Sequence, residues 1–233
     1  MFNKYFYDSL LFFRNHFIAL AAIILPIVVP LEFISMLVIQ PRIDDPNSTG
    51  AILMPMLLDF LASPIYMVAC IFYIDAIIRD EKRDVKSLWR AGIQNWFTYL
   101  VLSIMVGFVV AIGLLMFILP GIYFAVRFAF AQFELLFNRL NPPDAIRSSW
   151  RMTTEHQVVI LIGFVVITII LYGPLILFSS AFSELIKANW IIGSLINMLY
   201  AVLTMLYTIF CFRVYDDARR QTGIPADNST PGE

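Results

Sequence analysis

Apolar residues in this chain come in runs of about twenty, separated by short polar stretches. A helix needs about 20 apolar residues to cross the roughly 30 Å hydrocarbon core of a bilayer. Four runs meet that length easily, a fifth contains a Gly-Pro kink, and a sixth is short and interrupted by polar residues. The predicted spans are 16–39, 56–78, 96–119, 121–137, 158–180 and 190–212. We therefore predict an all-α fold, a polytopic transmembrane bundle of about six helices.

The span at 121–137 needs a separate test because it contains Arg127, Gln132 and Glu134. Its strongly apolar residues contribute roughly −4 kcal/mol to insertion, whereas an arginine near the centre costs about +3 kcal/mol. The segment is therefore marginal alone, and we expect it to insert as the second limb of a hairpin that turns at 119–121. The sequence leaves open whether this limb crosses fully or is re-entrant.

The distribution of basic residues favours six spans over five. With six spans, thirteen of the sixteen Lys and Arg residues fall on one side, while Arg42 and Lys187 fall on the other and Arg127 lies within the membrane. With five spans, the basic residues after Pro120 are divided much less cleanly. Because short basic loops stay in the cytoplasm, we predict six spans with both termini cytoplasmic.

Short amphipathic stretches with aromatic residues precede three of the spans, at 5–15, 84–97 and 144–157. Such stretches predict short helices that lie at the membrane interface. The last two share a Ser, Trp, Arg order, which suggests a repeated unit of interfacial helix plus hairpin. The end of the chain, 222–233, has no apolar pattern and is predicted to be disordered. Residues 1–221 then form a single membrane domain.

The amino-acid composition limits the classes of partner that this chain can bind. Hydrophobic residues make up 60% of the chain and charged residues 14%, against roughly a quarter charged in ordinary soluble domains. The apolar excess must therefore face the lipid bilayer. A net charge of −1 and the lack of a basic tail argue against nucleic acid. The basic segment 79–90 makes anionic lipid at the cytoplasmic face a candidate partner, and protein partners cannot be read from the sequence.

Three ionisable residues form the candidate intramembrane polar site: Arg127, Glu32 and Glu134. Charged groups inside a membrane are costly, so each is a functional candidate by default. Arg127 can bind an anionic headgroup or substrate, and Glu32 lies beside Pro26 and Pro30, where a broken helix can form a polar cavity. The structural alternative is that Arg127 simply pairs with Glu32, or with Glu134 two helical turns away.

Two stripes of small residues are candidate helix-packing faces, because small side chains let membrane helices approach closely. They consist of Ser103, Gly107 and Ala111 in the third span and Gly193, Asn197 and Ala201 in the sixth. We expect packing within the chain, with a dimer face as the alternative.

Motifs for catalysis are not visible. The chain has no HExxH motif, nucleophile elbow, metal-ligand cluster or phosphate-binding glycine loop. Cys70 and Cys211 lie in separate apolar runs and are predicted to be buried thiols. We therefore predict no enzyme activity and no cofactor or metal.

Five short stretches are similar to the YciC family of uncharacterised bacterial inner-membrane proteins. They are "FFRNHF" (12–17), "SLWRAGIQNW" (87–96), "ILPGIYFAVRFAFA" (118–131), "DAIRSSWRMT" (144–153) and "FRVYDDARRQ" (212–221). The resemblance implies a multi-pass inner-membrane protein and no particular mechanism. Arg127 departs from the family pattern, which is apolar at this position.

The sequence supports two alternative predictions of function. The leading prediction is a non-enzymatic membrane protein with a structural, interaction or envelope-maintenance role. The alternative is a small-solute or ion transporter or channel with a polar site around Arg127 and Glu32. Solute flux separates the two, because only a transporter should lose flux when Arg127 is replaced by leucine.

Overall fold

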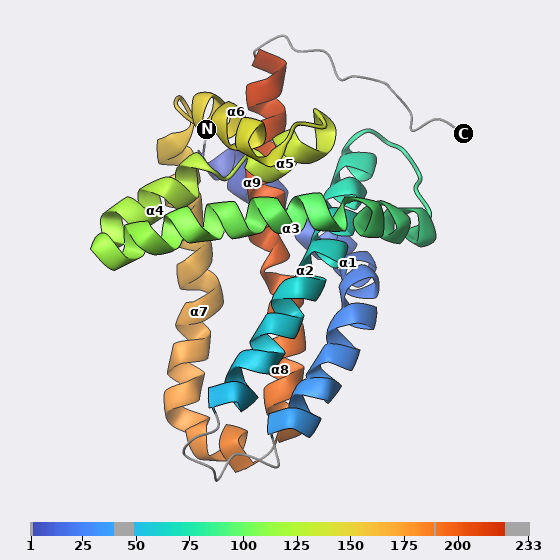
Figure 1. Cartoon of the computed structure of the whole chain (residues 1–233), viewed down its shortest axis with the longest axis vertical. Coiled ribbons are helices and arrows are strands. Elements are labelled where there is room, and N and C mark those ends of the chain that lie inside the picture. The colour runs from blue at the N-terminus through green and yellow to red at the C-terminus, as the bar shows by residue number, and fades with distance from the viewer. Residues whose placement is uncertain (1, 40–48, 189, 222–233) are drawn as a thin grey trace. The chain divides into compact units, whose positions relative to one another are not determined.

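The protein is described by a computed structural model that covers residues 2–39, 49–188 and 190–221 (Figure 1). All the regular elements in these ranges are α-helices, which confirms the predicted all-α class. They are α1 (Phe2–Ile39), α2 (Thr49–Ile78), α3 (Val85–Met116), α4 (Ile118–Arg127), α5 (Ala131–Phe137), α6 (Pro142–Met152), α7 (Gln157–Ala188), α8 (Trp190–Leu203) and α9 (Met205–Gln221). The predicted tail at 222–233 and the loop residue Arg42 lie outside the described residues.

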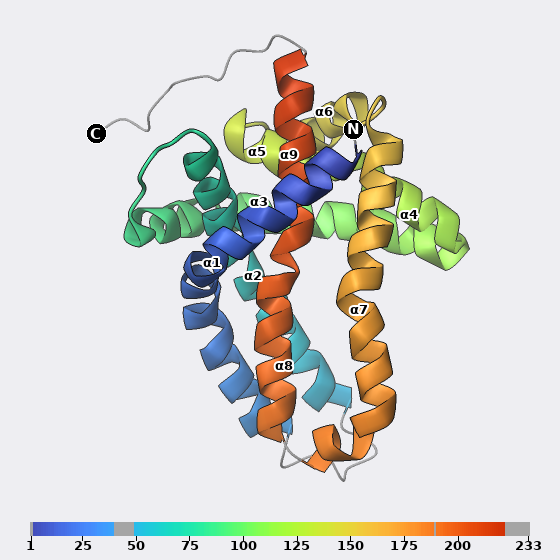
Figure 2. The same ribbon diagram turned by 180° about the vertical axis from the view of Figure 1, so that it is seen from behind.

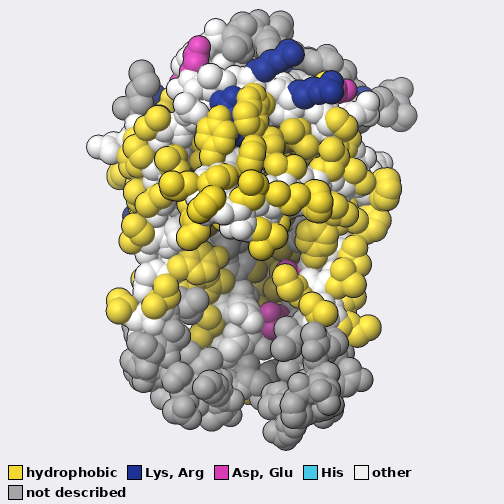
Figure 3. Space-filling model, turned by 60° about the vertical axis from the view of Figure 1, so that its left-hand side comes forward, with side chains coloured by type: hydrophobic (Ala, Val, Ile, Leu, Met, Phe, Trp, Pro, Cys, Tyr) yellow, Lys and Arg dark blue, Asp and Glu magenta, His cyan; other side chains and the backbone are white. Residues whose placement is uncertain are grey.

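Six stretches of the described chain are long and apolar enough to cross a membrane. They are Phe2–Ser35, Leu53–Ile78, Val85–Met116, Ile118–Phe137, Gln157–Pro174 and Ile191–Gln221. Hydrophobic side chains cover much of the described part of the face drawn in Figure 3. The described chain also has strongly exposed hydrophobic residues such as Leu115, Phe117 and Leu119. An apolar outer surface needs an apolar solvent, so these helices support a multi-pass membrane protein in contact with lipid.

The helix boundaries differ from the predicted ones where no residue stops the helix. α1 and α3 run unbroken through the stretches predicted as separate interfacial helices at 5–15 and 84–97. Neither stretch contains a proline that could end a helix there. The third stretch does form a helix of its own, α6, which begins at Pro142 and Pro143. Proline is favoured at the first helical positions because it lacks the amide proton that would have no partner there.

The contacts divide the described chain into two compact units, where the sequence predicted one domain. Unit 1 comprises residues 2–11, 97–166 and 207–221, and unit 2 comprises residues 12–39, 49–96, 167–188 and 190–206. The candidate residues are therefore described unit by unit.

In unit 1, α3 and α4 form a tight hairpin that runs across α9 in both ribbon views (Figures 1 and 2). A Cβ built on Gly113 would come within 2.9 Å of the Gly121 backbone, so only glycine permits this approach. α7 and α9 meet at Gly163, where an added Cβ would be 2.1 Å from the Phe210 ring. α5 and α6 pack against each other beside α9.

Unit 2 contains most of α1, all of α2, the start of α3, the rest of α7, and α8. Its buried side chains include Leu20, Ile23, Ile24, Val68, Ile71 and Ile74. Polar groups find partners between its helices: the Tyr200 hydroxyl donates to the Leu171 carbonyl at 2.6 Å. Asp75 and Arg79, one helical turn apart, form an ion pair at 2.8 Å.

The close helix approaches do not involve the glycines of the two predicted stripes. A Cβ on Gly107 or Gly193 would meet no described atom within 4 Å. Close contacts occur instead at Gly92, Gly113 and Gly163, where a neighbouring helix or ring fills the space of the missing side chain. The packing role of the two stripes therefore stays a prediction, because spacing alone does not show which face of a helix is covered.

Candidate functional site

The fourth apolar stretch is not one helix, because it breaks at Arg127. α4 ends there and α5 begins at Ala131, with a turn between them. Ser149 of α6 bridges this break: its hydroxyl donates to the Arg127 carbonyl at 2.8 Å and accepts from the Phe130 amide at 3.2 Å. Backbone groups freed inside a membrane protein must find partners within the protein. Ser149 supplies one partner on each side of the break.

α6 can reach the break because one of its faces is made of small residues. Ala145, Ser149 and Thr153 follow one another at four-residue intervals and are fully buried. Residues four apart lie on the same face of a helix. The Thr153 hydroxyl lies 2.8 Å from the Ser149 carbonyl and 3.2 Å from the Arg127 carbonyl. This face therefore combines close approach with hydroxyl groups placed at the freed backbone.

The Arg127 side chain turns back onto α6 and is only 5% exposed. It donates to the Thr154 hydroxyl at 3.0 Å. Its guanidinium carbon lies 4.3 Å from the centre of the Trp150 ring and 5.9 Å from that of Tyr123. A cation over an aromatic face is attracted by the ring quadrupole, more strongly where water is excluded. Nε is buried and has no hydrogen-bond partner among the described residues.

The Glu134 carboxylate, 3% exposed, is surrounded by hydrogen-bond donors. Tyr215 of α9 donates to one oxygen at 2.8 Å. Ser148 of α6 and Asn138 donate to the other at 2.5 and 3.0 Å. Bonds to an ionised group are roughly twice as strong as those between neutral groups. Three neutral donors from three parts of unit 1 thus stabilise this buried anion.

Aromatic rings hold Tyr215 in position. Its ring is almost fully buried and lies 5.1 Å from the ring of Phe133 and 5.5 Å from that of Phe130, centre to centre. Such edge and offset contacts are worth about 0.5–1.5 kcal/mol each beyond the area they bury. Because Phe133 and Glu134 belong to α5 and Phe130 directly precedes it, ring packing and the hydroxyl bond fix α9 to the same short helix.

The predicted site residues do not form one pair. Arg127 and Glu134 both lie in unit 1, yet no described ion pair joins them, so the predicted alternative of an Arg127–Glu134 pair was wrong. The intervening break turns the two side chains toward different parts of α6. Glu32 belongs to unit 2, where its carboxyl lies within hydrogen-bonding reach of Ser194 and Asn197.

Sequence reasoning missed the residues that complete this site: Ser148, Ser149, Trp150, Thr153, Thr154 and Tyr215. A signal for the hydroxyl groups was present, because Ala145, Ser149 and Thr153 form a small-residue stripe. The search for stripes considered only the apolar spans and passed over this short polar helix. Nothing in the sequence indicated that Tyr215 would meet Glu134, 81 residues away.

Chemically, the site is a closed set of hydrogen bonds rather than an open set of reactive groups. Asn138 donates to Glu134 and accepts from Arg219 at 3.4 Å, which extends the set toward the end of α9. No group of three or more His, Cys, Asp or Glu residues within the described ranges could hold a metal ion. Comparisons of the chain with family models, with curated proteins and with solved structures found no match.

Proposed function

We propose that this chain is a non-enzymatic, multi-pass protein of the bacterial inner membrane with a structural, interaction or envelope-maintenance role. The observation that supports the role is that two buried charged residues of unit 1, Arg127 and Glu134, make their contacts within the fold itself. The resemblance to the YciC family supports the location and adds no mechanism.

A transport or catalytic residue must have hydrogen-bonding capacity left for its cargo. Glu134 already accepts three hydrogen bonds from residues of its own unit. Arg127 is covered by two rings and a threonine, and its one group without a partner among the described residues, Nε, is buried beneath them. A buried charge with such a shell specifies how neighbouring elements pack. In this proposal Arg127 and Glu134 therefore hold α4, α5 and α6 together.

In this proposal, partners bind the end of unit 1 that carries Arg147 of α6 and Arg220 of α9. The side chains of Arg147 and Arg220 are 77% and 70% exposed, and each is paired with a carboxylate of its own helix, Asp144 at 3.8 Å and Asp216 at 2.8 Å. Exposed pairs of this kind are worth about 0–1 kcal/mol, so either arginine can exchange its partner for a lipid anion. Each basic residue near an anionic bilayer surface is worth about 1 kcal/mol of attraction. Anionic lipid headgroups at the cytoplasmic face are thus the proposed partner of this end.

The position of this end is tested by thiol labelling at Asp144, whose side chain is 55% exposed. The variant is Asp144→Cys with Cys70 and Cys211 changed to alanine, treated in intact cells with a membrane-impermeant reagent. We expect labelling only after the membrane is opened. Labelling from outside would contradict the cytoplasmic placement of α6.

The role is tested by flux. Purified protein in liposomes should move none of a panel of ions and small metabolites, and Arg127→Leu should change stability without changing flux. A solute that crosses with the parent chain and stops with Arg127→Leu would replace this proposal with the transporter alternative.

One observation favours that alternative, and it lies in unit 2. The Glu32 carboxyl of α1 is near Ser194 and Asn197 of α8 and near the Asp59 carboxyl of α2. Polar groups from three helices thus converge at one place. If a cation passes here, Glu32→Gln should abolish its flux while Asp84→Asn, in the loop before α3, should leave it unchanged. Equal flux in both variants would remove Glu32 from consideration.

A further inference from the structure

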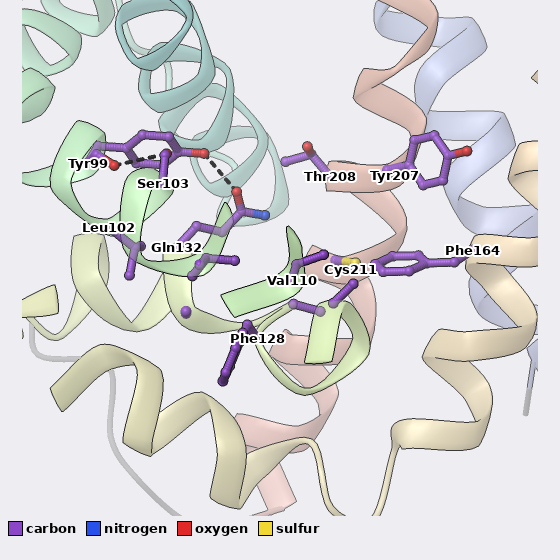
Figure 4. Close-up of a pocket in the computed structure, with 14 residues that line it drawn as sticks. Tyr99, Leu102, Ser103, Val110, Phe128, Gln132, Phe164, Tyr207, Thr208 and Cys211 are labelled. Carbon is purple, nitrogen blue, oxygen red and sulfur yellow. Dashed lines mark hydrogen bonds between the residues drawn. The ribbon is translucent and has the colours of Figure 1, made fainter. Parts of the chain in front are cut away.

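Unit 1 contains a pocket of about 240 Å³ on the other side of α5 from Glu134 (Figure 4). α3, the α4–α5 break, α7 and α9 each contribute to its walls, and all fourteen lining residues belong to unit 1. Most of them are apolar, for example Leu102, Val106, Phe128 and Phe164. No lining residue carries a charge, so the pocket offers nothing to pair with an ion.

Two polar side chains in this pocket have unused hydrogen-bonding capacity. Gln132 accepts from the Tyr99 hydroxyl at 2.8 Å through its amide oxygen. Figure 4 shows its amide nitrogen turned away from Tyr99, toward the side where Thr208 lies. Neither that nitrogen nor the Thr208 hydroxyl, in a residue only 6% exposed, has a hydrogen-bond partner within the described chain.

The unused groups define what would bind. The Gln132 amide nitrogen only donates, and the Thr208 hydroxyl can donate as well. A carbonyl oxygen has two lone pairs and can accept a bond from each. The apolar walls and the absence of charge require the rest of the molecule to be neutral and hydrophobic. The size lies between a cavity of about 150 Å³ that holds benzene and pockets of at least about 300 Å³ for drug-sized ligands.

We propose that this pocket binds a neutral, membrane-soluble molecule through a carbonyl oxygen held by Gln132 and Thr208. Two sources supply this chemistry in a membrane, a quinone ring and the ester group of a glyceride. The Tyr99 hydroxyl holds the Gln132 amide with its oxygen toward α3, which leaves the nitrogen directed at the ligand. This inference goes beyond the structural role proposed above, and its test measures binding rather than flux.

The test uses the purified full chain in nanodiscs, with decylubiquinone and 1-monodecanoylglycerol as separate probes in calorimetric titrations. Saturable binding of either probe is expected, and the probe that binds identifies the source. Gln132→Leu should weaken that binding about tenfold, the equivalent of one lost hydrogen bond. Thr208→Val keeps the shape and should weaken binding about threefold.

Two controls keep the result specific. Gln94→Leu makes the same chemical change at an exposed position outside the pocket and should bind as the parent does. Val106→Phe fills the pocket from α3 and should abolish binding, and its unchanged helical content would show that it still folds. Failure of both probes to bind the parent, as expected if water alone fills the pocket, would overturn the proposal. Equal binding by Gln132→Leu and the parent would do the same.

Discussion

Two polar residues of α5, Gln132 and Glu134, lie two positions apart and face opposite kinds of surroundings. Glu134 carries a charge and has three donors in place. Gln132 is neutral and has one partner, with its amide nitrogen left over. From the cost of membrane insertion alone, Glu134 would be the stronger functional candidate, since a buried charge is more expensive than a buried amide. What distinguishes them is the number of hydrogen bonds that the protein itself supplies.

The difference gives a physical criterion for reading polar residues in an apolar chain. A saturated group contributes to the cohesion of the fold, and its removal leaves its partners unsatisfied. An unsaturated group contributes little cohesion and retains capacity for something outside the chain. The comparison therefore predicts opposite effects on stability and on binding for substitutions two residues apart.

The largest effect is expected for Glu134→Ala. Removal of the carboxylate leaves the donors of Tyr215, Ser148 and Asn138 without an acceptor in a buried place. Each buried donor left without an acceptor costs about 1–3 kcal/mol, so with three donors affected we expect a loss of about 3 kcal/mol or more in the free energy of unfolding in detergent. Glu155→Ala, at an exposed carboxylate beyond α6, is the control. A loss below about 1 kcal/mol would show that the three bonds are not cohesive.

Ser149→Ala should have the next largest effect. The substitution removes one hydroxyl and leaves both the Arg127 carbonyl and the Phe130 amide without this partner. The Arg127 carbonyl keeps its contact with the Thr153 hydroxyl, so we expect a loss of about 1–3 kcal/mol, the cost of one unsatisfied buried group, the Phe130 amide. Ser63→Ala removes an exposed hydroxyl that bonds within its own helix and should change stability by less than about 0.5 kcal/mol. Equal effects at the two serines would argue that Ser149 does not hold the break.

How much of this the sequence could predict depends on the range of the interactions. The apolar runs correctly predicted the helical class and six candidate spans, because hydropathy over about 20 residues is a local property. The break at Arg127 was not predicted as such, although the cost of Arg127 marked the segment as marginal. The break depends on Ser149, more than twenty residues later in the chain, and no local pattern reports on that contact.

The distribution of basic residues is also limited in what it predicts about the spans. α3 and α4 form one hairpin, so the loops before and after it stay on the same side of the membrane whether both limbs cross or neither does. The positive-inside rule separates six spans from five but is silent on this pair. The hairpin has no polar side chain between Ser103 and Tyr123. Its depth therefore depends on the packing of Gly113 on Gly121 and on its direction across α9, which only the structure shows.

A smaller effect is expected for Arg127→Leu, although Arg127 is the most conspicuous residue of the sequence. The substitution removes a hydrogen bond to Thr154 and a ring contact worth about 2 kcal/mol when desolvated. It also removes a buried cation with no ion pair, whose insertion costs about 3 kcal/mol. Because these terms nearly cancel, we expect the stability to change by no more than about 1 kcal/mol. Arg127→Lys keeps the charge and loses the planar ring contact, so it should be the less stable of the two variants.

The smallest change in stability is expected for Gln132→Leu. Replacement of the Gln132 amide by an apolar group of similar size removes one hydrogen bond and leaves the Tyr99 hydroxyl without this acceptor, whereas Glu134→Ala leaves three donors without theirs. We expect a change of less than about 1 kcal/mol in the free energy of unfolding, measured beside Glu134→Ala in the same detergent. The same variant should lose most of its affinity for the carbonyl probe that the parent binds. A large loss of stability would mean that Gln132 is saturated in the membrane, and the contrast within α5 would then be wrong. Retained stability with lost binding would show that one seven-residue helix carries cohesion on one face and recognition on the other.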